Sequence, residues 1–180
     1  YVANQAAKLL QKPLSECNLI TVHLGNGASI CAIQKGKSID TTMGFTPLEG
    51  LMMGTRCGDI DPSIIFELYR KKKSIDEIER MCNTQSGLLG ICGQSDFVAI
   101  EKMMDRRHQD AILAFEMFTH RVKKYIGAYK ELLEDVDAVV FTGGIGENSA
   151  RVRLHSTIGV DELKNQDAKF GFTKFCILIF

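Results

Sequence analysis

The segment His23-Leu24-Gly25-Asn26-Gly27-Ala28-Ser29 carries residues that could hold a phosphate group. It lies between two short apolar stretches that we expect to be strands, so it should form the turn that joins them. Glycines leave the backbone N–H groups of such a turn open to close approach by an anion. An ordinary hairpin turn explains the same residues, because Asn-Gly is the preferred pair of a type I′ turn. The sequence leaves both interpretations open.

Arg56 is the second candidate, a single cation in the otherwise glycine-rich and apolar loop Met52–Gly58. A guanidinium group in a partly dry loop suits the negative charge that spreads over a phosphoryl group during its transfer. The alternative is a surface arginine paired with Asp59 or Asp61, which follow it closely in the sequence. The spacing fits both interpretations.

The third candidate is the glycine-rich segment Gly143-Gly144-Ile145-Gly146. It follows Asp137–Thr142, a run that is apolar on both faces, as is typical of a strand buried between helices in a parallel sheet. We expect Asn148 to cap the helix that starts there. A strand, a glycine loop and a helix N-terminus together favour the binding of anionic or ribose groups.

Two familiar phosphate-binding motifs are almost present, and both are excluded. Gly36-Lys37-Ser38 ends like a Walker A loop, but Cys31 stands where that motif requires its first glycine. Gly144-Ile145-Gly146 begins like a dinucleotide-binding motif, but Ser149 stands at the position of the third glycine. We therefore predict neither a P-loop nor a dinucleotide site.

The elements that must position these residues form a mixture of strands and helices. Apolar runs predict strands over Leu19–Val22, Ile30–Ile33 and Lys37–Thr42, with a hairpin turn at Gln34–Lys37. Helix signals are a cap at Asp61-Pro62, a capping box from Ser74 to Glu77, and apolar periodicity in Tyr1–Gln11 and Gln109–Glu134. The apolar stripe of the last helix is expected to pack in the core and comprises Ala111, Phe115, Phe118, Val122, Tyr125, Tyr129 and Leu132.

Composition excludes several classes of protein. The 180 residues include 22 Lys+Arg and 22 Asp+Glu, so the formal net charge is 0. This balance argues against a general binder of nucleic acid or of membrane surfaces, and no apolar run is long enough to span a membrane. The 6 cysteines show no zinc-ligand spacing, so we predict no metal site and a reducing, cytoplasmic location. Length alone predicts one domain.

Three strings of the sequence resemble the acetate kinase family: HLGNGASI (His23–Ile30), MGFTPLEGLMMGTR (Met43–Arg56) and FTGGIGENS (Phe141–Ser149). They occur in the family's order, and the resemblance runs from Tyr1 to about Arg153. It implies an ATP:acetate phosphotransferase with the duplicated fold of sugar kinases, Hsp70 and actin. The implied fold class is α/β, a ribonuclease-H-like (actin-like ATPase) domain with a mixed sheet flanked by helices.

The resemblance also implies roles for particular residues. Arg56 matches the arginine that stabilises the in-line transition state of the family. The second phosphate loop is matched by His23, Leu24, Gly25, Asn26 and Gly27, and the adenosine loop by Gly144, Ile145, Gly146, Glu147 and Asn148. A segment that lines the adenine and ribose pocket is matched by Asp96, Phe97 and Val98. Val98 stands where the family usually has arginine, and the loss of that planar cation could weaken ATP binding.

At both ends the resemblance implies parts of the enzyme outside this chain. The first phosphate loop, the acetate-pocket arginine and the catalytic aspartate would precede it, and the glutamate that binds the metal would follow it. We expect residues 1–153 to form most of the C-terminal nucleotide-binding domain and residues 154–180 to form a divergent tail. The apolar end Phe175–Phe180 indicates either an altered terminus or a strand that completes the sheet.

The intact enzyme would transfer a phosphoryl group reversibly from ATP to acetate, giving acetyl phosphate and ADP, with Mg²⁺ as cofactor. One alternative is an isolated, catalytically inactive fragment that at most binds nucleotide. Another is a related propionate or butyrate kinase, whose acyl pocket would lie outside this chain. The resemblance further implies a cytoplasmic homodimer that acts on small molecules and has no nucleic-acid or membrane partner.

Overall fold

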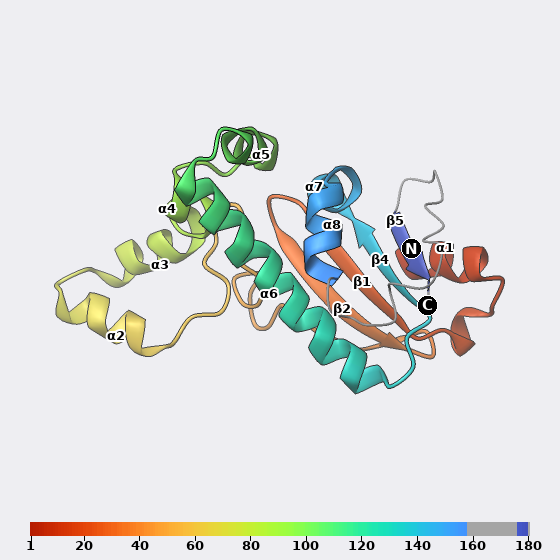
Figure 1. Ribbon diagram of the computed structural model, residues 1–180. Coiled ribbons are helices and arrows are strands. Elements are labelled where there is room, and N and C mark those ends of the chain that lie inside the picture. Colours follow the sequence, from red (N-terminus) through yellow and green to blue (C-terminus); the bar gives the residue numbers. More distant parts are fainter. Residues whose placement is uncertain (158–175, 180) are drawn as a thin grey trace. The chain divides into compact units, whose positions relative to one another are not determined.

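The computed structural model describes residues 1–157 and 176–179 of the chain (Figure 1). The chain divides into two compact units. Unit 1 comprises Tyr1–Thr42 and Thr119–Phe180, and unit 2 comprises Met43–Phe118. Helix α6 (Gln109–Leu133) therefore contributes its first residues to unit 2 and the remainder to unit 1.

Unit 1 is built on a five-stranded mixed sheet with the strand order β3-β2-β1-β4-β5. Strand β1 pairs in parallel with β4, and the other three pairings are antiparallel. The strands are β1 (Leu19–Leu24), β2 (Ala28–Gln34), β3 (Lys37–Thr41), β4 (Ala138–Thr142) and β5 (Cys176–Ile179). This arrangement confirms the strands predicted from the apolar runs and the mixed α/β class.

The burial of each strand follows its place in the sheet. All five residues of β4 are buried, as expected for a strand covered on both faces, whereas every residue of the edge strand β3 is exposed. The turn between β2 and β3 has positive φ at Lys35 (49°) and Gly36 (77°), as a type I′ hairpin requires. The backbone of β5 pairs with that of β4, so a strand does complete the sheet near the end of the chain.

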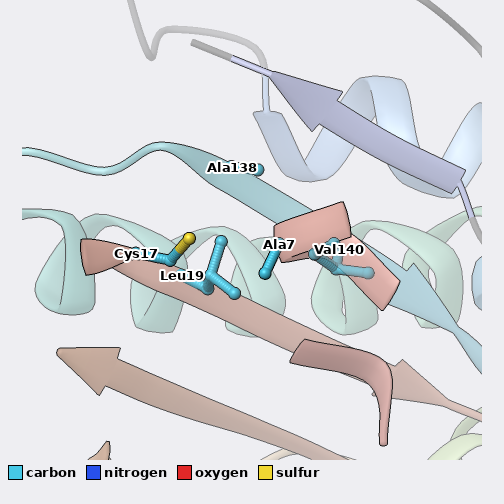
Figure 2. Packing of buried hydrophobic residues seen from close by; sticks show 6 residues of the cluster. Ala7, Cys17, Leu19, Ala138 and Val140 are labelled. Atoms are coloured by element: carbon cyan, nitrogen blue, oxygen red, sulfur yellow. The ribbon is translucent and has the colours of Figure 1, made fainter. Parts of the chain in front are cut away.

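Short side chains allow the first helix of unit 1 to lie close to the sheet. Helix α1 (Val2–Leu10) places Ala6 and Ala7 against Leu19 of β1 and against Ala138 and Val140 of β4 (Figure 2). The 3₁₀ turn η1 (Leu14–Glu16) follows and leads into β1. Two further helices, α7 (Gly143–Asn148) and α8 (Ala150–Thr157), come directly after β4.

Unit 2 consists of a long loop followed by helices. Residues 43–62 contain no regular element, as predicted for the glycine-rich segment. The helices are α2 (Ser63–Arg70), α3 (Ile75–Thr84), α4 (Gly87–Cys92), α5 (Phe97–Asp105) and the first part of α6. The predicted capping box is present, with the Ser74 hydroxyl and the Glu77 carboxylate each accepting the other residue's backbone N–H. Helix α4 was not predicted, because its sequence is rich in glycine.

Helix α6 buries a stripe that differs from the predicted one at its C-terminal end. Phe115, Phe118, Val122 and Tyr129 are buried as expected, but Leu132 is 49% exposed and Leu133 takes its place inside. Steps of three and four residues from Tyr129 lead to both positions, and the 3.6-residue turn brings Leu133 back to the buried face.

Across the described residues no helix is both long and apolar enough to cross a membrane.

We predict that Tyr129→Phe lowers the free energy of unfolding by about 1 kcal/mol. The Tyr129 hydroxyl donates a hydrogen bond of 3.2 Å to Asp40 Oδ1, and the ring is 4% exposed. Burial raises the pKa of the Tyr129 phenol, so this donor stays protonated at any ordinary pH. Urea unfolding followed by circular dichroism measures the change.

The matched control is Tyr69→Phe, since the Tyr69 ring is 63% exposed. This change should alter the free energy of unfolding by less than about 0.5 kcal/mol. Equal stabilities for the two variants would show that the hydrogen bond to Asp40 does not stabilise the sheet against α6.

Candidate active site: two glycine loops at one sheet edge and a separate arginine loop

The parallel pairing of β1 and β4 brings two of the predicted segments together. His23, near the end of β1, is in register with Thr142, the last residue of β4. Because parallel strands end at the same edge of a sheet, the segments after them, Gly25–Gly27 and Gly143–Asn148, leave from that edge side by side. The ideal Cβ position of Gly146 lies 3.7 Å from Leu24 Cβ, which confirms the close approach.

The first segment forms the tight turn between β1 and β2. Gly25 N donates to Gly27 O at 2.9 Å, and Leu24 pairs with Ala28 across the turn. None of Gly25, Asn26 and Gly27 has a positive φ. The turn is therefore a hairpin, but it is not the type I′ turn that an Asn-Gly pair would favour.

His23 links the two segments through its side chain. Its Nδ1 lies 2.9 Å from the Thr142 hydroxyl oxygen, at hydrogen-bond distance. The ring lies next to both glycine segments, with Cε1 3.1 Å from the ideal Cβ position of Gly143 and Nε2 3.8 Å from that of Gly25. Although the residue is exposed, the ring is therefore held against the backbone of both loops.

The second segment is a short helix, α7, where an open loop was predicted. Gly143 has φ +79° and its ideal Cβ position lies only 2.5 Å from Leu24 O, so this position requires glycine. Gly143 N donates to Glu147 Oε1 at 3.0 Å, and Arg153 Nη1 donates to the carbonyls of Gly146 and Glu147 at 2.9 Å each. These bonds fix both ends of α7.

Asn148 does not have the predicted role of a helix cap. It is the last residue of α7, and its side-chain amide donates to Gly144 O at 2.8 Å. The hydroxyl of Ser149 accepts from Val152 N at 3.1 Å instead, so Ser149 caps α8. The prediction missed by one residue because the glycine run itself is helical.

Arg56 lies in unit 2, in a loop held by the start of α4. Gly87 has φ +61° and its ideal Cβ position lies 2.7 Å from Arg56 O and 2.1 Å from Met53 O. Only glycine fits so close to the loop backbone. The Arg56 side chain is half-buried, and its Nη1 donates to Pro47 O at 3.1 Å.

Asp59 and Asp61, the two acids that the alternative interpretation paired with Arg56, accept hydrogen bonds from backbone N–H groups. Asp59 Oδ1 accepts from Gly50 N and Asp61 Oδ1 accepts from Ser63 N, each at 2.8 Å. The bond from Ser63 lowers the pKa of the Asp61 carboxyl, because it stabilises the charged form. Both acids therefore shape the backbone of the loop.

Asp96, Phe97 and Val98 also belong to unit 2, at the start of α5. The Asp96 carboxylate caps this helix by accepting from Val98 N. Phe97 is buried, with its ring centroid 5.3 Å from that of Phe118 and 6.1 Å from that of Phe115. Phe97 is therefore a core residue of its unit, whereas the Val98 side chain is 58% exposed.

Three residues that support the candidate segments were not predicted: Thr142 and Arg153 in unit 1, and Gly87 in unit 2. Thr142 was predicted only as the end of an apolar strand. Arg153 donates to carbonyl groups that lie six and seven residues before it in the sequence. Gly87 lies 31 residues after Arg56 by number. The one local signal for the start of α4 is Ser86, a residue type common at helix N-caps, which stands just before Gly87 and the apolar run.

The thiols and carboxylates of the described residues do not form a metal site. No group of three or more His, Cys, Asp or Glu side chains in residues 1–157 and 176–179 could hold a metal ion. Cys17, Cys31, Cys57, Cys82 and Cys92 are free thiols. Burial and the neighbouring Cys82 raise the pKa of the Cys57 thiol to about 11, so it stays protonated near neutral pH.

The sheet and site of unit 1 define a ribonuclease-H-like domain of the actin-like ATPase class, the fold shared by the solved structures that the chain resembles. The model of the acetokinase family matches residues 1–171. The chain belongs to this family. The match extends past Arg153, where the resemblance carried by the motifs ended.

Individual relatives agree with this assignment. The acetate kinase of Sulfurovum sp. is 54% identical over 178 residues, which cover 94% of this chain and 45% of that protein. The crystal structure of Porphyromonas gingivalis acetate kinase has 41% identity and a TM-score of 0.87 over 90% of this chain and 41% of that chain. A propionate kinase from Francisella tularensis has 48% identity and a TM-score of 0.86, covering 91% and 42%. The chain spans less than half the length of each of these proteins.

We predict that Gly143→Ala destabilises the chain by about 1–3 kcal/mol, since alanine would be strained at φ +79° and would meet Leu24 O. The control is Gly127→Ala in α6, where nothing lies within 4 Å of the ideal Cβ. That change should stabilise the chain by up to about 1 kcal/mol through helix propensity. Urea midpoints measure both, and a tolerated Gly143→Ala would contradict the described approach of α7 to β1.

Proposed function

We propose that this chain is most of the C-terminal, nucleotide-binding domain of an acetate kinase, an enzyme that transfers a phosphoryl group reversibly between ATP and acetate. The observation that carries the proposal is the meeting of two glycine segments on adjacent parallel strands, in a chain of the acetokinase family. Residues 1–153 would form the domain and residues 154–180 its divergent tail.

The two segments at the sheet edge would hold ATP. His23, Leu24, Gly25, Asn26 and Gly27 would contact the phosphates through loop N–H groups and the imidazole. The helix segment Gly144–Asn148, which includes Ile145, Gly146 and Glu147, would contact the adenosine. Its Gly144 has nothing within 4 Å of its ideal Cβ position, so a ligand can approach the backbone there.

Arg56 would stabilise the transition state. Its guanidinium group is half-buried, and its Nη1 donates to the carbonyl oxygen of Pro47. An arginine that keeps its charge in a partly dry loop can neutralise the charge that develops on the equatorial oxygens of a phosphoryl group. Catalysis would therefore consist of positioning and charge stabilisation.

The segment Asp96–Val98 is a weaker part of the nucleotide site. The burial of Phe97 leaves Asp96 and Val98 as the side chains that could reach a ligand. Valine offers no side-chain hydrogen bond and no cation for stacking, so we propose that Val98 contributes shape rather than charge.

Mg²⁺ would neutralise charge on the phosphate oxygens when it is bound. The resemblance to the family implies a metal-binding glutamate outside this chain, so we propose that the protein ligands of Mg²⁺ lie elsewhere in the enzyme. We propose acetate as the acceptor, a cytoplasmic location and a homodimeric enzyme. Propionate is the second candidate acceptor, since the Francisella structure with 48% identity is a propionate kinase.

The prediction for the adenosine segment is that Gly144→Ala weakens ATP and ADP binding by at least about 10-fold and does not lower the free energy of unfolding. The added methyl group meets no protein atom within 4 Å, but it occupies the space proposed for the ligand. Calorimetric titration of the 180-residue chain measures binding, with Gly127→Ala as control. Unchanged affinity in Gly144→Ala would contradict the proposed contact.

The prediction for Arg56 concerns the complete enzyme. Arg56→Ala should lower kcat for acetyl phosphate formation by about 100-fold or more, in the range found for the loss of a group that stabilises transition-state charge. Arg56→Lys should restore part of the loss, because it keeps the charge but not the planar fork. A hydroxamate assay measures the rates.

Arg70→Ala is the matched control, since the Arg70 side chain is 73% exposed and paired with Glu67 on the surface of α2. It should leave kcat unchanged. An Arg56→Ala enzyme that keeps most of its activity would exclude the proposed role. Turnover by the 180-residue chain alone would exclude the alternative of an inactive, nucleotide-binding fragment.

A further inference from the structure

The side chain of Thr142 lies where the two proposed nucleotide loops meet. Thr142 is the last residue of β4 and is 6% exposed. Its hydroxyl oxygen lies 2.9 Å from Nδ1 of His23, its partner in the parallel pairing of β4 with β1. Because residues paired in register present their side chains on the same face of the sheet, this contact depends on the sheet itself.

The Thr142 hydroxyl does not cap a helix, although a threonine before a helix often does so. Thr142 is the N-cap residue of α7, yet it makes no side-chain cap hydrogen bond. The first N–H of that helix, on Gly143, donates to Glu147 Oε1 instead. Glu147 thereby leaves the Thr142 hydroxyl available to His23.

The hydrogen bond at Nδ1 decides what the other ring nitrogen can do. The 2.9 Å distance by itself allows either the hydroxyl or Nδ1–H to be the donor. Thr142 is 6% exposed, and a hydroxyl that accepted from Nδ1–H would have to place its own proton elsewhere in this buried position, which favours the hydroxyl as donor. A neutral imidazole carries one proton, so a hydroxyl that donates to Nδ1 places the proton on Nε2. Nε2 is the nitrogen on the side of the first loop, 3.8 Å from the ideal Cβ position of Gly25. An N–H at Nε2 can donate to a phosphate oxygen, whereas a lone pair there would repel it.

We propose that Thr142 is a positioning residue that holds His23 as the Nε2–H tautomer, so that the imidazole donates to the phosphates of the nucleotide. The role in nucleotide binding rests on the proposed function. The tautomer itself does not, because the hydrogen bond exists without any ligand.

The tautomer can be observed directly in the 180-residue chain labelled with ¹⁵N-histidine. The chain has 4 histidines, and His23→Gln identifies the signals of His23. At a pH where His23 is neutral by its own titration, we expect Nδ1 to have the shift of an unprotonated nitrogen and Nε2 that of a protonated one. The opposite pattern would overturn the proposal, whether or not the chain binds nucleotide.

Two substitutions distinguish a role of the Thr142 hydroxyl in orienting His23 from a purely structural role of Thr142 in the strand. Thr142→Ser keeps the hydroxyl, and Thr142→Val keeps the branched shape without it. We expect Thr142→Val to give a mixture of both tautomers and to lower kcat/KM for ATP in the complete enzyme by about 10-fold, the size of one lost hydrogen bond. Thr142→Ser should stay within about 2-fold of the unchanged enzyme.

A purely structural role would give the reverse order, because valine suits a strand and serine does not. Full activity in Thr142→Val with loss in Thr142→Ser would therefore overturn the proposal. If circular dichroism shows that Thr142→Val does not fold, the His23 tautomer in the unchanged chain and in Thr142→Ser tests the proposal instead. If His23→Gln binds ATP as well as the unchanged chain, the proposed contact of His23 with the phosphates is wrong. The tautomer of His23 is measured without nucleotide, so that result is independent of ATP binding.

Discussion

The parallel pairing of β1 with β4 is the constraint on which the candidate site depends. The two strands are far apart in sequence, since Thr142 comes 119 positions after His23, and their pairing sets these two residues side by side. A shift of one residue in register would turn the side chain of Thr142 to the other face of the sheet. Burial of all five residues of β4 opposes such a shift, since Val139 and Phe141 would then exchange faces with Ala138, Val140 and Thr142.

The strands and the long helix could be predicted from the sequence because their signals are local. The apolar run Asp137–Thr142 and the periodicity of Gln109–Glu134 each contain enough residues to establish an element. The glycine segment after β4 could not be predicted as a helix. The four residues Gly-Gly-Ile-Gly have poor helix propensity, and α7 is held instead by hydrogen bonds that Glu147 accepts and that Arg153 donates.

The candidate residues could be found from sequence motifs, but the contacts that hold them in place could be seen only in the structure. Arg56 was predicted as a candidate from its isolation in an apolar loop, yet the same spacing fitted a pair with Asp59 or Asp61. In the structure the carboxylates of Asp59 and Asp61 accept from the backbone N–H groups of Gly50 and Ser63. The spacing of charges in the sequence does not indicate these contacts.

We propose that the segments Gly25–Gly27 and Gly143–Asn148 form one nucleotide site. A titration of the ¹⁵N-labelled 180-residue chain with ATP, followed through its backbone amide signals, tests this directly. We expect shifts at Gly25, Gly27, Gly144 and Gly146 with a single dissociation constant, and none at Gly36, in the turn at the other end of β2. Shifts confined to one segment, or none at saturating ATP, would contradict it.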